Sequence, residues 1–109
     1  MRYKIKCIIK RPDEKYGHVT NISQRLENLQ KTVEGYIETV PAVGGAIILC
    51  NEEGKLRGLE NNMPYEKDYL VGTIIVVGTK GDEFDDIPID LATWKRFVDD
   101  QASGRNIYE

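Results

Sequence analysis

The sequence predicts an α+β fold: one domain spanning residues 1–109, with a mostly antiparallel sheet of about five strands and two helices packed on it. Residues 3–9 alternate apolar with mostly charged side chains, the period of a strand with one buried face. Segments 46–50 and 71–77 are rich in aliphatic residues, as expected for strands covered on both faces. Two further segments repeat apolar residues at helical spacing. A chain of 109 residues has room for one such domain.

The first strand is predicted at residues 3–10, where lysines occupy its wet face. Lysines along a strand discourage pairing with another molecule, so we expect this strand at an edge of the sheet. Pro12 ends it because proline cannot donate to a ladder. A helix follows, with Asn21 as its N-cap and Gly35 as its left-handed stop. Its apolar stripe consists of Ile22, Leu26, Leu29 and Val33.

The middle of the chain predicts a strand, a second strand and a hairpin. Residues 36–40 form a short strand, and the apolar segment 46–50 forms the next. The run Asn51-Glu52-Glu53-Gly54 is typical of a hairpin loop with glycine in the left-handed position. The return strand is therefore predicted at residues 55–59.

The last third predicts a polar loop, a central strand and a second helix. Residues 60–68 form the loop, the strand runs from about 69 to 77, and residues 83–87 could pair with it as a short exposed strand. Asp90 is a plausible N-cap for a helix over about 90–102. Its buried stripe consists of Leu91, Trp94, Phe97 and Val98. The predicted order is strand, helix, four strands, helix.

Charge and composition exclude several classes of protein. The net charge of −3 disfavours a nucleic-acid partner, although a DNA regulator using the basic first strand stays open as a third hypothesis. No apolar run is long enough for a membrane span and no signal peptide is visible, so we expect a cytoplasmic protein. Residues 1–15 are basic and residues 82–100 are acidic, an asymmetry that could support contacts between identical copies.

No motif in the sequence predicts a cofactor, a metal ion or a catalytic group. Gly54-Lys55 lacks the serine or threonine of a phosphate loop, and Gly44-Gly45 precedes a strand instead of following one. The acidic segment 82–90 does not have calcium-loop spacing. Cys7 and Cys50 lie among aliphatic residues, so we expect buried, reduced thiols. One histidine and two isolated cysteines do not make a zinc site.

The polar hairpin and loop over residues 51–62 form the one candidate binding surface. Amides, charged groups and tyrosines on loops over a rigid sheet can recognise a partner, although an ordinary polar turn would have the same composition. The candidate residues are Asn51, Glu52, Lys55, Arg57, Asn61, Asn62 and Tyr65. An alternative site is a pocket around Glu38, Glu52 and Lys55, in which paired carboxylates would do acid–base work.

Several segments resemble an uncharacterised family, domain of unknown function 3846, from phages and mobile elements of Firmicutes-type bacteria. They are Gly35 to Glu38, Ile48 to Leu56, Gly58-Leu59, Asn62 and Val71 to Thr73. The resemblance covers about residues 28–80. Family members tend to have proline after Gly-Leu, where this chain has Glu60. The resemblance implies a genomic setting and no mechanism.

These observations predict a small, non-enzymatic accessory protein of a phage or mobile element. It would bind a host protein or a small polar ligand through residues 51–62. The alternative is a nucleotide-sequestering protein or a small enzyme. A pocket of several hundred cubic ångströms lined by Lys55, Glu38 and tyrosines would favour a ligand, whereas a convex hairpin would favour a protein partner.

Overall fold

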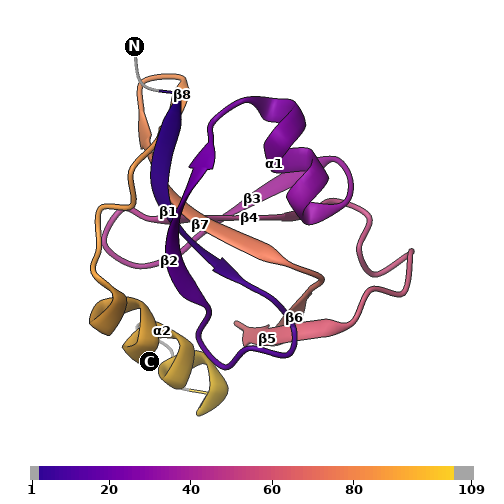
Figure 1. Ribbon diagram of the computed structural model, residues 1–109. Coiled ribbons are helices and arrows are strands. Elements are labelled where there is room, and N and C mark those ends of the chain that lie inside the picture. The colour runs from indigo at the N-terminus through magenta and orange to yellow at the C-terminus, as the bar shows by residue number, and fades with distance from the viewer. Residues whose placement is uncertain (1–2, 105–109) are drawn as a thin grey trace.

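An antiparallel sheet forms the centre of the computed structural model, which describes residues 3–104 (Figure 1). The strands are β1 (Lys4–Lys10), β2 (His18–Ser23), β3 (Ile37–Pro41), β4 (Ile47–Asn51), β5 (Asn61–Tyr65), β6 (Asp68–Val71), β7 (Ile74–Lys80) and β8 (Glu83–Asp85), and the helices are α1 (Leu26–Val33) and α2 (Leu91–Ala102). The strand order is β2-β1-β7-β4-β3. β8 extends the sheet by pairing with residues 78–80 of β7, and β5 and β6 form a separate hairpin.

The side chains of β7 divide the interior into two cores, one on each face of the sheet. Ile75 and Val77 join the core that contains Leu29 of α1. Ile74 and Val76 alternate with them and join the core that contains Trp94 of α2 and residues of the β5–β6 hairpin. Because successive strand residues point to opposite faces, α1 covers one face, and α2 and the hairpin cover the other. The predicted α+β fold, a mostly antiparallel sheet with two helices packed on it, is confirmed.

Two predictions for the N-terminal part of the chain were wrong: that the first strand is an edge of the sheet, and that the first helix begins after Asn21. β1 lies between β2 and β7, and β2 occupies the edge. Asn21 lies in β2 opposite Lys6, so it does not cap a helix. Helix α1 begins only at Leu26, which is exposed, after Arg25. The apolar spacing of residues 22–33 matched a helix, but Ile22 belongs to a strand that pairs along nearly all of β1.

The helix α1 ends one residue earlier than Gly35 predicts. Glu34 adopts the left-handed conformation, with φ of 64°. A Cβ atom at Gly35 would lie 2.7 Å from Nδ2 of Asn51. Gly35 is therefore required by the close approach of the Asn51 side chain, not by a left-handed backbone.

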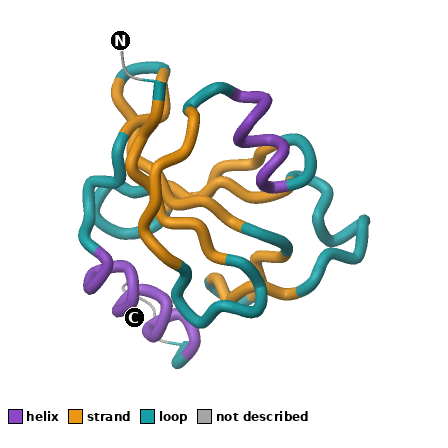
Figure 2. The backbone as a smooth tube through the Cα atoms, in the orientation of Figure 1, coloured by secondary structure: helices purple, strands orange, loops and turns teal. Residues whose placement is uncertain are grey.

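The predicted return strand at 55–59 does not form. Residues 52–58 make a compact series of turns, in which the N–H of Arg57 donates to O of Glu53, and Figure 2 draws this segment as loop. The predicted loop at 60–68 instead holds β5 and the turn into β6. The strand predicted over 69–77 is broken at Gly72, which has a φ of 74°. β6 ends just before this residue, and the chain then turns into β7.

The remaining predicted elements are close to those observed. β4 is buried along most of its length, β8 is shorter than residues 83–87, and Asp90 caps α2 by accepting a hydrogen bond from the N–H of Thr93. None of the helices within residues 3–104 is long and apolar enough to cross a bilayer. Arg2, part of the basic segment 1–15, and residues 105–109 lie outside the described residues.

Candidate functional site

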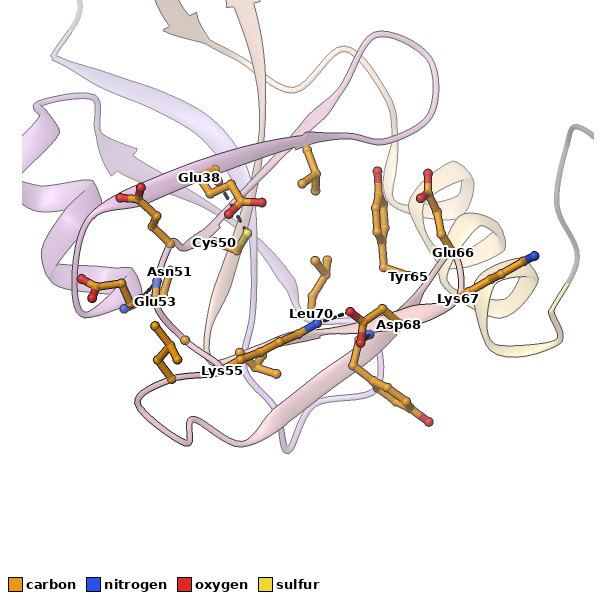
Figure 3. A pocket seen from close by; sticks show the side chains of 16 residues that line it. Glu38, Cys50, Asn51, Glu53, Lys55, Tyr65, Glu66, Lys67, Asp68 and Leu70 are labelled. Carbon is orange, nitrogen blue, oxygen red and sulfur yellow. Dashed lines mark hydrogen bonds and ion pairs between the residues drawn. The ribbon is translucent and has the colours of Figure 1, made fainter.

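A groove of about 470 Å³ separates the β3–β4 edge of the sheet from the β5–β6 hairpin (Figure 3). Residues 38 and 40 of β3 and residues 50 and 51 of β4 form one wall. Residues 52–56 close one end, and residues 65–71 of the hairpin form the opposite wall. The groove is therefore built from three segments that are separated along the chain.

The groove is lined by more carboxylates than ammonium groups. The acidic side chains are those of Glu38, Glu52, Glu53, Glu66 and Asp68, and the basic ones are those of Lys55 and Lys67. Five negative and two positive groups give the groove a net charge of −3. Such a surface attracts cations and repels phosphate groups.

An ion pair joins the turn segment at one end of the groove to the hairpin wall. Nζ of Lys55, in the turn segment, donates to Oδ2 of Asp68, at the start of β6. This hydrogen bond and that from the N–H of Tyr69 hold the pKa of the Asp68 carboxyl below its ordinary value. The side chains of Lys55 and Asp68 are 58% and 68% exposed, so both groups stay accessible to solvent.

The groove also has apolar surface at its rim. Leu56 is 88% exposed and Tyr69 is 48% exposed, and both line the groove. Tyr65 is held in place because its hydroxyl donates to O of Pro41, 2.7 Å away on β3. An amphipathic molecule would therefore find carboxylates and hydrocarbon surface side by side.

Cys50 lines the groove as a protonated thiol. Its Sγ donates to O of Glu38 at 3.5 Å, and burial, with a smaller contribution from the Glu38 charge, raises its pKa to about 11. Burial also raises the pKa of Cys7 to about 11. Both cysteines are free and buried, as predicted, so neither is a thiolate nucleophile at neutral pH.

Two predicted binding residues serve the backbone. Asn51 is buried; its Nδ2 donates to O of Val33 at 2.9 Å, and its Oδ1 accepts from the N–H of Glu53 at 2.8 Å. Arg57 donates to O of Glu34. The bonds to O of Val33 and O of Glu34 satisfy carbonyl groups at the end of α1, which a helix leaves without partners.

Asn62, another predicted binding residue, fastens the hairpin to the sheet. Its Nδ2 donates to O of Lys10 and to O of Gly72, each at 2.8 Å. In return, Nζ of Lys10 donates to Oδ1 of Asn62 at 2.8 Å and to its backbone O at 3.1 Å. We call these four bonds the Lys10–Asn62 clip. It fixes the wall of the groove that β6 provides.

The structure thus brings some of the predicted site residues together and separates others. Four of them, Asn51, Glu52, Lys55 and Tyr65, line the groove, and so does Glu38 from the alternative site. Arg57, Asn61 and Asn62 do not line it. The sequence-based candidate list lacked Glu53, Leu56, Glu66, Asp68 and Tyr69, which also line the groove. Glu66 and Asp68 lie in the segment 60–68, where a loop was predicted in place of β5 and the turn into β6.

A family model described as "Domain of unknown function (DUF3846)" matches residues 5–100 of the chain. The chain belongs to this family. The match extends beyond the predicted 28–80 and includes most of β1 and most of α2. No curated protein and no solved structure shows significant similarity to the chain.

The acidic segment 82–90 of this DUF3846 domain has structural roles. Asp86 accepts a hydrogen bond from the N–H of Lys6 at 2.7 Å, and Asp90 caps α2. Within residues 3–104, no group of three or more His, Cys, Asp or Glu side chains is placed to hold a metal ion. The His18 ring lies 3.1 Å from Glu14, outside the groove.

The buried ammonium group of Lys10 predicts a pH dependence of stability. Lys10 is 2% exposed, and burial lowers its pKa from the ordinary 10.5, against smaller opposing effects of Glu14 and Asp13. Between the folded-state pKa and 10.5 the unfolded chain binds more protons than the folded one, so this contribution to stability rises with pH.

Urea unfolding of the wild type and of Lys10→Met, at a series of pH values up to 10.5, isolates this contribution. The free energy of unfolding of the wild type should rise relative to that of the variant as the pH increases. A difference that stays flat or falls would contradict the prediction.

Proposed function

We propose that this DUF3846 domain is a non-enzymatic accessory protein of a phage or mobile element that binds a small polar ligand in the groove. The observation that carries the proposal is the groove of about 470 Å³ lined by Glu38, Lys55, Tyr65 and Tyr69. Its volume lies within the range of small-molecule sites, about 300–1,000 Å³. Residues 52–56, part of the hairpin surface that the sequence predicted for binding, thus form one end of a concavity.

The chemistry of the lining supports binding more than catalysis. Among residues 3–104, no histidine, serine or threonine lines the groove, and the thiol of Cys50 stays protonated. Nucleophilic catalysis needs an activated nucleophile beside a base. The excess of carboxylates also counts against sequestration of a nucleotide, because its phosphates would be repelled.

A host protein is the second candidate partner. Leu56 projects from the 52–58 turns with 88% of its surface exposed, and exposed apolar residues beside a concavity are common at protein interfaces. The concave shape still favours a ligand small enough to enter.

A nuclear magnetic resonance titration with a panel of neutral, anionic and cationic polar fragments tests the proposal. We expect at least one fragment to shift the backbone amides of residues 38–40, 50–56 and 65–71. Fragments of about 12 atoms should bind with a Kd of roughly 1 mM.

The matched variants are Glu38→Gln, which lies in the groove, and Glu83→Gln, which makes the same charge change on β8 outside it. Glu38→Gln should change the affinity for a bound fragment, and Glu83→Gln should leave it within about twofold. If no fragment shifts the groove amides, the ligand proposal fails. Retention of a host protein that depends on Leu56 would then support the second candidate.

A further inference from the structure

We propose that the ligand is an amphipathic organic cation, an alkylammonium or guanidinium group on an apolar body, and that it displaces Lys55 from Asp68. This inference rests on the proposed function and names the chemical class of its ligand. Three features of the groove support it: an internal cation already bound there, the charge that remains around that cation, and the apolar rim.

The groove already holds an alkylammonium group of its own. Lys55 extends from the turn segment to Asp68 on the opposite wall, as Figure 3 shows. An exposed ion pair of this kind contributes little to stability. A ligand cation can therefore take the place of Nζ of Lys55, because the side chain can move into solvent without unfolding any element.

The groove remains acidic when Lys55 is counted. Glu38 on β3 and Glu66 on the hairpin turn supply carboxylates from opposite walls. In Figure 3 the Glu38 side chain lies across the groove from Tyr65 and Leu70. A cation that reaches Asp68 would lie among further acceptors, whereas an anion would meet repulsion from both walls.

The rim selects for a body of hydrocarbon or aromatic character. Leu56 and Tyr69 are exposed and face solvent at the groove, and Tyr65 is fixed by its bond to Pro41. Tyrosine rings attract cations through their faces and pack against alkyl stems. A fully hydrated inorganic cation would use none of this surface.

Three probes with related skeletons and different charge test the inference: phenethylammonium, phenethyl alcohol and hydrocinnamate. Affinities are measured from the shifts of the groove amides at low salt. We expect phenethylammonium to bind at least about fivefold more tightly than the alcohol, and hydrocinnamate not to bind. The affinity for phenethylammonium should fall as salt is added.

The variant Lys55→Gln distinguishes competition from a supporting role. If Lys55 is an internal competitor, its removal should raise the affinity for phenethylammonium by about two- to fivefold. Asp68→Asn should lower that affinity by about threefold or more, because it removes the negative charge that attracts the ligand cation and one of its two acceptor oxygens. Lys80→Gln makes the same charge change on β7, away from the groove, and should leave the affinity within about twofold.

Unchanged or weaker binding in Lys55→Gln would overturn the inference, as would equal binding of the alcohol or tighter binding of hydrocinnamate. If the groove amides still shift with any of these probes, the proposed function stands. The absence of shifts with all three overturns the inference alone, because the wider fragment panel decides the proposed function.

Discussion

Replacing Asn62 by alanine is expected to lower the free energy of unfolding by about 3 kcal/mol. The substitution removes the Oδ1 acceptor of the Lys10 ammonium group, which is buried, and leaves only the backbone O at 3.1 Å. It also leaves O of Lys10 and O of Gly72 without their bonds to Nδ2. Urea unfolding followed by circular dichroism measures the effect.

The neighbouring substitution Asn61→Ala is the matched control. Asn61 has the same side chain on the same strand, but it is exposed and takes no part in the Lys10–Asn62 clip. Its replacement should change the stability by no more than about 0.5 kcal/mol. Equal effects of the two substitutions would show that the clip does not hold the hairpin. Asn62→Ala should also weaken ligand binding, because β6 forms a wall of the groove.

Replacing Trp94 by alanine should destabilise the fold by about 3–5 kcal/mol. Trp94 is fully buried in the core between α2 and the sheet, and its ring stacks on Phe97 with centroids 5.5 Å apart. Its Nε1 donates to O of Tyr16 at 2.8 Å. The alanine variant leaves both a cavity and a carbonyl without its partner.

Trp94→Phe separates the contribution of the hydrogen bond from that of the buried ring. Arg96→Ala controls for the effect of an alanine substitution on the helix itself. Trp94→Phe keeps much of the ring volume and loses the hydrogen bond, so its effect should fall between those of the alanine variant and the wild type. Arg96 is exposed on α2, and Arg96→Ala should change stability by less than about 0.5 kcal/mol. A loss below about 1 kcal/mol in Trp94→Ala would contradict the assigned core.

The sequence predicts well those elements whose burial is strong and regular. On β1, Ile5, Cys7 and Ile9 face the core that contains α1, as the alternation predicts, and Lys4 and Lys6 are exposed. The predicted wet face for the lysines was wrong at the end of the strand, because Ile8 and Lys10 are buried on the other face of the sheet. β4 and β7 are apolar because both of their faces are covered. β2 is an edge strand with no fully buried residue, so its pattern is weak. Ile22 then falls by chance at helical spacing from Leu26, and the local pattern favours the wrong element.

The candidate site was predicted less completely because a polar residue in a sequence has two possible uses. Asn51, Arg57 and Asn62 bind backbone carbonyl groups 10 to 52 residues away along the chain. No local pattern reveals such partners, and the same composition describes a surface open to a ligand. Lys55 and Glu52, which the sequence offered as candidate residues, do line the groove, and the turns that carry them are exposed.

The attachment of the β5–β6 hairpin ties local opening to the middle of the sheet. The chain continues from the hairpin through Gly72 into β7. The Lys10–Asn62 clip joins the hairpin to β1 by hydrogen bonds. These two strands are neighbours in the interior of the strand order. The hairpin is therefore not an independent flap: lifting it off the sheet would break the clip and expose the core face of β7, against which Met63 and Leu70 pack.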